Sequence, residues 1–206
     1  MKIHDFPGFP NPARVRIALA EKGLTDKVEF IHVDVPAGEH QQDAFRSKNP
    51  SAAVPVLELE DGTMISECTA ITEYLDNLDG SPTLTGTTPK QRAVTSMMQR
   101  RAEAGLLDAV AAYFHHATPG LGPDIEKSQC EPWGKLQHDR AIDGMRYLDK
   151  VLADQPYIAG KDFSVADITA FAGLAFAGFA KIDVPDDCAN LKAWHEKVAQ
   201  RPSVAG

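Results

Sequence analysis

Strand signals are confined to the first 79 residues of this chain, whereas helical signals continue to its end. Three early segments are rich in β-branched and apolar residues, namely KIHDF, VEFIHV and VPVLELEDGTMIS. Beyond the Gly-, Pro-, Ser- and Thr-rich segment DGSPTLTGTTP, apolar residues recur only at helical spacing, near 89–116, 131–153, 164–180 and 189–200. This order predicts an α/β domain (residues 1–79), a linker (80–88) and an all-α domain (89–206).

The first predicted domain alternates between strand and helix. Its order is strand, helix, strand, then two strands and a helix, and the Asp61-Gly62 pair between apolar runs predicts a hairpin. In the first helix, Asn11 suits the N-cap and Pro12 suits the first helical position, which needs no amide hydrogen. Because parallel strands need a helical crossover, we expect a mixed sheet with helices on its faces.

The composition of the chain argues against several classes of function. A formal net charge of −8 opposes a nucleic-acid partner, whose phosphates would repel the protein. The segment MKIHDFPGFP lacks the apolar run of a signal peptide, and the longest apolar block, residues 168–180, is shorter than the roughly 18 residues that span a bilayer. The three cysteines are widely spaced, which fits neither a disulfide framework nor a metal cluster. We expect a cytoplasmic protein without a membrane partner or a bound metal.

One helix of the second domain has a well-marked start. Ser164 can cap the helix, and Asp167, three residues later, can return a hydrogen bond to the cap. Phe163 can pack against Ile168 as a hydrophobic staple. These residues predict a capping box at the beginning of this helix.

The Val54-Pro55 pair opens the predicted hairpin and has two interpretations. Proline cannot donate to a strand ladder, so an ordinary trans proline at the first position of an edge strand would explain it, and only about 5–6% of X-Pro bonds are cis. A cis bond would instead turn the Val54 N–H and C=O outward, where they could pair with an extended peptide. Base rates favour the trans form, and the residues alone leave both forms open.

Three other residues of this domain could bind a ligand or serve only the fold. Glu67 and Cys68 mark a strand-to-helix junction, where an N-cap with a favourable first-turn acid would explain them. Alternatively, the first-turn amides and the Cys68 thiol hold a carboxylate, and Glu67 binds the α-ammonium group of the same amino acid. His40 lies in a loose polar segment, where it is either solvated or close to a second carboxylate of the ligand.

Tyr113, His115 and His116 end the first long helix of the second domain. These side chains could supply acid–base groups or the polar wall of an apolar pocket. A purely structural explanation is that a helix C-terminus favours histidine through its dipole. No third ligand follows at a suitable spacing, so the pair of histidines does not predict a metal site.

Together these segments resemble the cytosolic glutathione S-transferases, a family with a thioredoxin-like domain, a linker and an all-helical domain. VPVLELEDGTMISECTAITEYL is similar to the stretch that holds the family's cis-proline and its Glu-Ser pair, and YIAGKDFSVADITAF is similar to its N-capping motif. PARVRIALAEK, ECTAITEYLD and YFHHATPGLGP are particularly similar to the atypical yeast-type class, which lacks a catalytic Tyr, Ser or Cys, and to its bacterial relatives. The resemblance covers nearly the whole chain.

The resemblance implies a binding site for the tripeptide glutathione. The Val54 backbone would pair with the cysteinyl part, with Pro55 in the cis form. Glu67 and Cys68 would hold the γ-glutamyl end, and His40 would approach the glycine carboxylate. Cys68 stands where the family usually has serine. Because a thiol is a weaker hydrogen-bond donor than a hydroxyl, the helix amides would have to contribute a larger share of the binding of the γ-glutamyl carboxylate.

The family's usual catalytic residue is missing. Most members place Ser, Tyr or Cys just after the first strand, to hydrogen-bond the glutathione sulfur or to form a disulfide with it. This sequence has in their place Phe9, Pro10, Asn11 and Pro12. We expect the helix N-terminus and a second donor to stabilise the thiolate, the donor being the Asn11 side chain, a bound water, or Tyr113 or His116. In the plain alternative, Asn11 only caps the helix.

The resemblance implies a transferase that conjugates glutathione, its co-substrate, to a small apolar electrophile. We expect that electrophile near Phe9, Tyr113, His115 and His116. A homodimer is also implied, with helix 89–116 of each subunit at the contact. Two alternatives stay open: a glutathione-dependent disulfide or peroxide reductase, and a non-catalytic protein that only binds glutathione or another ligand.

Overall fold

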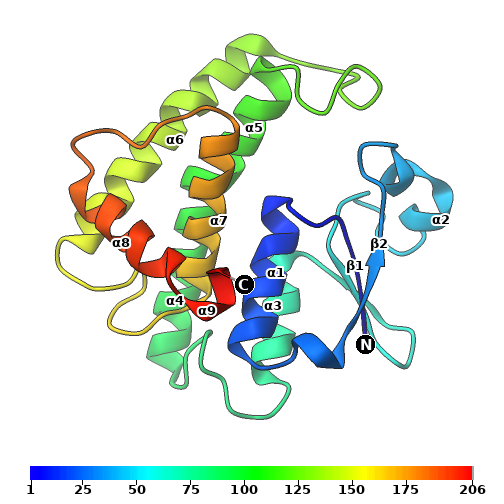
Figure 1. Ribbon diagram of the computed structural model, residues 1–206, viewed down its shortest axis with the longest axis horizontal. Helices are drawn as coiled ribbons and strands as arrows, with labels where there is room; N and C mark the ends of the chain where they lie inside the picture. Colours follow the sequence, from blue (N-terminus) through cyan, green and yellow to red (C-terminus); the bar gives the residue numbers. More distant parts are fainter. Residues whose placement is uncertain (206) are drawn as a thin grey trace. The chain divides into compact units, whose positions relative to one another are not determined.

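The computed structural model describes residues 1–205 in two compact units, the first comprising Met1–Ser81 and the second beginning at Pro82 (Figure 1). Each unit has its own secondary structure and is described by itself. Within the described residues, no helix has both the length and the apolar character needed to cross a membrane.

The first unit is built on a four-stranded mixed sheet in the order β2-β1-β3-β4. Its strands are β1 (Lys2–Asp5), β2 (Glu29–His32), β3 (Val56–Glu58) and β4 (Met64–Ser66). β1 pairs with β2 in parallel and with β3 antiparallel, and β3 pairs antiparallel with β4. The mixed sheet and the hairpin are therefore confirmed, and the Asp61 carboxylate accepts from the Thr63 N–H within the hairpin turn.

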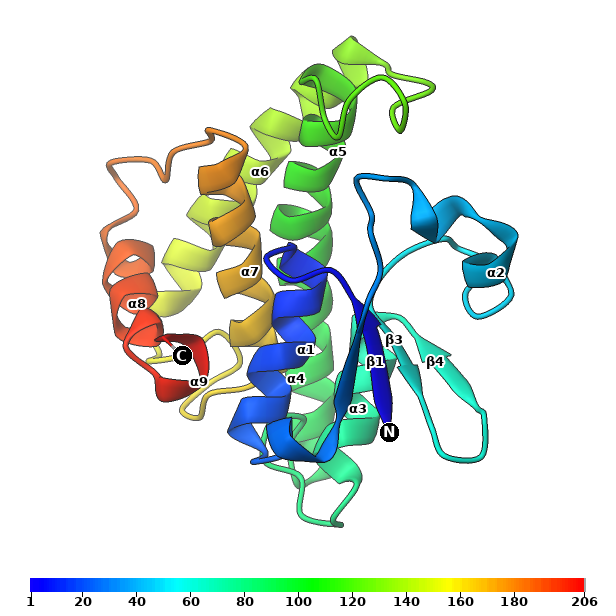
Figure 2. The same ribbon diagram turned by 45° about the vertical axis from the view of Figure 1, so that its right-hand side comes forward.

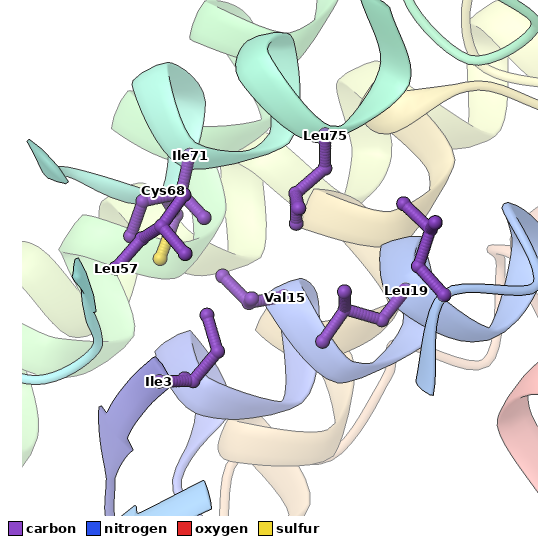
Figure 3. Packing of buried hydrophobic residues seen from close by; sticks show 8 residues of the cluster. Ile3, Val15, Leu19, Leu57, Cys68, Ile71 and Leu75 are labelled. Carbon is purple, nitrogen blue, oxygen red and sulfur yellow. The ribbon is translucent and has the colours of Figure 1, made fainter. Parts of the chain in front are cut away.

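Helices cover both faces of this sheet. α1 (Pro10–Glu21) and α3 (Cys68–Asn77) lie side by side, and the short helix α2 (Asp43–Arg46) lies away from them (Figures 1 and 2). Adjacent residues of β3 point to opposite faces. Val56 packs with Val33 and Phe45, whereas Leu57 belongs to the core under α1 and α3. Figure 3 shows that core, which contains Ile3, Val15, Leu19, Leu57, Cys68, Ile71 and Leu75.

The second unit is helical, as predicted. Its helices are α4 (Pro89–Ala102), α5 (Asp108–Ala117), α6 (Glu131–Leu152), α7 (Val165–Phe179), α8 (Ala189–Ala199) and α9 (Pro202–Ala205). The first predicted helix is a continuous run, but a π-helical turn, η3 (Glu103–Leu107), separates α4 from α5. Neither this turn nor the four-residue helix α9 is predicted by the apolar spacing of the sequence.

Two glycines bring η3 and α6 into backbone contact. A Cβ atom added at Gly144 of α6 would lie 2.7 Å from the carbonyl carbon of Gly105 in η3. Real Cβ atoms do not approach backbone atoms that closely, so this crossing requires glycine at residue 144. The π-turn thus contains a residue at which the two helix backbones are in contact, which is a feature of packing and not of local sequence.

The capping box at the start of α7 is confirmed. The Ser164 side chain accepts from the Ala166 N–H, and one carboxylate oxygen of Asp167 accepts from the Ser164 N–H at 3.0 Å and from its hydroxyl at 2.9 Å. The other oxygen accepts from the Ile158 N–H at 2.8 Å and from the Trp194 indole N–H at 3.0 Å. Asp167 is completely buried, and burial raises the pKa of its carboxyl to about 6. This one side chain therefore ties the start of α7 to the preceding loop and to α8.

Candidate active site

Asn11 is the second residue of α1 and does not cap it. The helix begins at Pro10 and its N-cap is Phe9, whose carbonyl accepts from the Ala13 N–H at 3.0 Å. The prediction of Asn11 as N-cap and Pro12 as first helical residue is wrong by two positions. The physical reason is that Pro10 suits the first helical position as well as Pro12 does, because neither has an N–H that needs a partner.

The start of α1 offers a single backbone donor. Pro10 and Pro12 have no amide hydrogen, so only Asn11 has a backbone N–H among the first three helical residues. No acceptor for this N–H occurs within residues 1–205. A helix N-terminus usually offers four such groups. Any anion at this end of α1 would therefore meet one amide and the partial positive charge of the helix.

The Asn11 side chain is oriented by Arg14. Its Oδ1 accepts from Arg14 Nη1 at 3.0 Å. Because a guanidinium only donates, the oxygen of the Asn11 amide must face it, which leaves Nδ2 on the other side of the amide. Asn11 is exposed, and its Nδ2 has no acceptor in the part of the chain that the structure describes. Asn11 thus presents both a backbone N–H and a side-chain NH₂ for a ligand.

A partly buried ion pair fixes α1 to the end of β1. The Asp5 carboxylate is almost fully buried and accepts from Arg16 Nε at 2.8 Å and from Arg16 Nη2 at 3.1 Å. The Arg16 guanidinium also lies 3.9 Å from the centre of the Phe30 ring. Such a two-point contact sets orientation as well as distance. The loop between β1 and α1 is therefore held at both of its ends.

The Val54-Pro55 peptide bond is cis, as the resemblance implied. Pro55 is buried, whereas Val54 is half-buried and precedes the first ladder residue of β3, Val56. Neither the N–H nor the C=O of Val54 has a hydrogen-bond partner within residues 1–205. Val54 therefore has the backbone groups that an added extended peptide would need.

Glu67 has an unusual backbone conformation at the start of α3. Its φ is 71° and its ψ is 121°, a region that residues with a side chain rarely adopt. The side chain is exposed, and the carbonyl accepts from the Ile71 N–H at 2.9 Å. The N–H groups of Thr69 and Ala70 in the first turn have no acceptor among residues 1–205. Two free amides and an exposed acid therefore meet at one helix end.

The Cys68 side chain points into the protein. It is buried in the core under α1 and α3 (Figure 3), and its thiol donates to the Asn11 carbonyl oxygen at 3.4 Å. The expectation that this thiol faces a bound carboxylate came from the strand-to-helix junction and from the family resemblance. The structure instead directs it toward α1, so the catalytic candidate Asn11 and the glutathione-binding candidate Cys68 contact each other.

His40 is buried and one of its ring nitrogens has no partner. It lies in the short segment η2 (Glu39–Gln41), after Gly38, whose positive φ of 75° favours glycine. Only 8% of its surface is exposed, and Nδ1 has no hydrogen-bond partner. Burial, and next the positive charge of Arg46, lower the pKa of His40. His40 is therefore neutral near pH 7 and buried, so the expectation of a solvated histidine is wrong. The other expectation, a place close to a ligand carboxylate, stays a prediction.

The histidines at the end of α5 are held in different tautomers. Nδ1 of His115 lies 2.7 Å from the Glu126 carboxylate, which can only accept, so His115 has its proton on Nδ1. Nδ1 of His116 accepts from the Cys130 N–H at 3.1 Å, so neutral His116 has its proton on Nε2. His116 can therefore donate through Nε2, whereas the same atom of neutral His115 is an acceptor.

The two predicted aromatic side chains have local ring contacts in their own units. Tyr113 of α5 packs edge-on against His138 of α6, with ring centres 5.1 Å apart. Phe9 of the first unit is half-buried, and the centre of its ring lies 4.6 Å from the centre of the Phe6 ring. Both rings are partly accessible, as a wall of a binding site must be.

Sequence reasoning missed the residues that hold the candidate groups in place. The interaction of Arg14 with Asn11 has a local signal, because residues three apart face each other on a helix. The pairing of Glu126 with His115 had none, because it depends on the path of the loop after α5. Within residues 1–205, no group of three or more His, Cys, Asp or Glu side chains could hold a metal ion.

Comparison with known proteins identifies the family. Residues 10–78 match the family model described as the glutathione S-transferase N-terminal domain, and residues 123–206 match that of the C-terminal domain. The chain is 56% identical to glutathione S-transferase 2 of Saccharomyces cerevisiae, over 99% of this chain and 88% of that protein. It is also 32% identical to a maleylacetoacetate isomerase of Pseudomonas aeruginosa, over 82% of this chain and 77% of that protein.

Solved structures agree with this match. The crystal structure of Gtt2 from Saccharomyces cerevisiae has a TM-score of 0.99 at 56% identity, covering 100% of this chain and 99% of that one. A glutathione S-transferase domain-containing protein of Marinobacter aquaeolei has a TM-score of 0.97 at 61% identity, covering 99% of this chain and 100% of that one. The chain therefore belongs to the glutathione S-transferase family of enzymes.

Proposed function

We propose that this protein conjugates the thiolate of glutathione to apolar electrophiles and that Asn11 stabilises the thiolate. The observation that carries the proposal is the hydrogen bonding of Asn11. Its Oδ1 is occupied by Arg14, which leaves the Nδ2 group and the backbone N–H as donors without acceptors in residues 1–205. They occur just after β1, where most family members have a Tyr, Ser or Cys side chain.

The magnitudes favour a side-chain donor in addition to the helix. A thiol with a pKa of about 8.5 is roughly 3% ionised at pH 7, and lowering that pKa by two units requires about 2.7 kcal/mol of preference for the anion. A helix dipole contributes about 0.3–1 kcal/mol in typical cases. A hydrogen bond to a charged group adds about 1.5–3 kcal/mol. One amide of α1 together with Nδ2 of Asn11 would therefore suffice.

The rest of glutathione would bind along the first unit. We assign its cysteinyl backbone to the unpaired N–H and C=O of Val54, in the manner of an added strand. The γ-glutamyl carboxylate is assigned to the free amides of Thr69 and Ala70, and its ammonium group to Glu67. The glycine carboxylate is assigned to the unpaired Nδ1 of His40.

In the reaction, the sulfur anion attacks an electrophilic carbon of the second substrate. A carbon–sulfur bond forms, the leaving group departs with its electron pair, and the thiol proton has already passed to solvent. We assign the binding of the apolar electrophile to side chains with accessible rings, namely Phe9, Tyr113, His115 and His116. The proton on Nε2 of His116 makes that residue a donor and not the base.

Titration of bound glutathione tests this function. We expect thiolate absorbance to appear at a pH about two units below that of free glutathione. In Asn11→Ala the midpoint should rise by about one unit, which corresponds to about 1.4 kcal/mol and a tenfold lower kcat/KM for an activated aryl halide below that midpoint. Asn190→Ala, a change in α8, is the control. Unchanged turnover in Asn11→Ala would remove Asn11 from the mechanism, and binding without ionisation would favour a non-catalytic carrier.

The role of His40 predicts uptake of protons on binding. Because burial lowers the pKa of free His40, the residue is neutral above its lowered value, and a bound carboxylate would raise that pKa again. Binding should therefore strengthen as the pH falls from alkaline values toward the lowered pKa of free His40. S-methylglutathione is the suitable ligand because it has no thiol proton. Calorimetry in two buffers of different ionisation enthalpy should show uptake by the wild type and by His32→Gln, but none by His40→Gln; equal uptake by all three proteins would contradict this assignment.

The setting that we propose is a cytoplasmic homodimer that removes reactive electrophiles. Within the described residues the three cysteines form no disulfide, which is consistent with a reducing compartment. α4 and α6 expose large apolar side chains that a partner subunit could cover, namely Met97, Trp133, Leu136 and Tyr147. Light scattering would measure the assembly, and a monomer at micromolar concentration would contradict it.

A further inference from the structure

Cys68 and Asn11 are joined although 57 residues separate them in the chain. Cys68 is the first residue of α3, and Asn11 is the second residue of α1. The thiol donates to the Asn11 carbonyl oxygen at 3.4 Å, within the range for a sulfur donor. The contact therefore links the starts of two different helices directly.

With this contact, both oxygen atoms of Asn11 accept a hydrogen bond from a side chain of the protein. Its side-chain oxygen is held by Arg14 at 3.0 Å, and its backbone oxygen is held by Cys68. A carbonyl oxygen has two lone pairs, so it can accept the thiol in addition to an N–H from the next helical turn. Both oxygen atoms of Asn11 thus have protein donors, while both of its nitrogen atoms remain available to a ligand.

The thiol also lies in a rigid part of the molecule. Its neighbours in the core include Val15 of α1, Leu57 of β3 and Ile71 of α3, all fully buried (Figure 3). Close-packed side chains transmit a displacement instead of absorbing it. A shift of α3 would therefore reach the start of α1 through Cys68.

We propose that Cys68 is a positioning residue for Asn11 and that its thiol couples occupation of the α3 amino end to stabilisation of the sulfur anion at α1. This inference rests on the proposed function, because it assigns the γ-glutamyl end of glutathione to α3 and the sulfur to the start of α1. It gives the thiol a role inside the protein, whereas the sequence analysis gave it direct contact with the γ-glutamyl carboxylate.

The two roles predict different losses when the thiol is removed. A direct ligand contributes to affinity, so its removal would weaken binding of every glutathione analogue. A positioning residue contributes to the alignment of Asn11, so its removal would change ionisation of bound glutathione and leave the affinity for S-methylglutathione almost unchanged. Small misplacements of a catalytic group cost far more in rate than in binding.

The experiment compares Cys68→Ala with Cys68→Ser, which retains a donor. In Cys68→Ala, the fraction of bound glutathione present as thiolate at pH 6.5 should fall about three- to tenfold, and Kd for S-methylglutathione should change by less than about twofold. Cys68→Ser should restore the ionisation. Cys188→Ala, which removes a buried thiol from the second unit, should match the wild type. If Cys68→Ala proves unstable, Cys68→Val removes the same donor with less loss of volume.

A double variant supplies the decisive comparison. Cys68 is proposed to act through residue 11, of which Asn11→Ala leaves only the backbone groups. The loss of ionisation caused by Cys68→Ala should therefore be smaller in the Asn11→Ala background than in the wild type. Additive losses, or a weaker Kd with normal ionisation in Cys68→Ala, would overturn the inference while leaving the proposed function intact. A wild type that binds glutathione without ionising it would refute the proposed function, and this inference with it.

Discussion

Replacing Asp167 by asparagine should lower the free energy of unfolding by about 3–5 kcal/mol. Asparagine keeps the shape of the side chain but exchanges one acceptor oxygen for an NH₂ group. That group would face either the N–H and hydroxyl of Ser164 or the N–H groups of Ile158 and Trp194, all of which donate to Asp167. The Ser164 hydroxyl can turn and accept, but an N–H cannot, so at least one buried N–H would lose its acceptor at a cost of about 1–3 kcal/mol. The remaining contacts would lose the charge of the carboxylate, and a hydrogen bond to a charged group contributes about 1.5–3 kcal/mol.

Urea denaturation at several pH values checks this result. The pKa of Asp167 in the folded protein, about 6, lies above its ordinary value of 3.8, so the folded state binds the proton more tightly. The resulting stabilisation is fully present below about pH 3.8 and is lost as the pH rises through 6. The difference between wild type and Asp167→Asn should therefore be about 1 kcal/mol larger at pH 5 than at pH 8.

An exposed aspartate of the second unit provides the control for this change. Asp154→Asn alters the same kind of group on the surface and should change stability by less than about 0.5 kcal/mol. An Asp167→Asn protein within about 1 kcal/mol of the wild type would show that the four donors find other partners.

Replacing Gly144 by alanine should destabilise the second unit by about 3 kcal/mol, at the upper end for overpacking. The new methyl group would overlap the Gly105 carbonyl of η3, so α6 or the π-turn would have to move. Neither neighbour is the flexible end of a side chain. Thermal and urea unfolding of the variant measure the loss.

Gly178→Ala is the matched control, because Gly178 is also helical and a Cβ there would have nothing within 4 Å. Alanine has the higher helix propensity, so this variant should gain about 0.5–1 kcal/mol. Equal stability of the two variants would contradict the proposed backbone contact between η3 and α6.

The elements that could be predicted are those whose signals are local. The capping box at Ser164 depends on two residues three apart, and the hairpin at Asp61-Gly62 depends on a turn between apolar runs. The mixed sheet follows from the order of strands and helices. The start of α1 was placed two residues late because two prolines offer equivalent starts and the actual N-cap, Phe9, uses only its backbone.

The parts that could not be predicted depend on proximity in space. Nothing in the sequence shows that Gly105 and Gly144 meet, so the π-turn at η3 was invisible. The side-chain direction of Cys68 is likewise set by the packing of α3 against α1. The candidate glutathione-binding residues could be assigned only through the family resemblance. The residues alone were explained equally well by ordinary structural roles, such as an edge proline or a helix cap.

The backbone of Glu67 has a consequence for engineering. At a φ of 71° glycine would have less backbone strain than a residue with a side chain. The acidic side chain of Glu67 therefore comes at a conformational cost of about 1–3 kcal/mol. A search for heat-tolerant variants would therefore select Glu67→Gly readily, and under our proposal that same change would remove the partner of the ligand's ammonium group. A screen for thermal stability that includes residue 67 should therefore also measure glutathione binding.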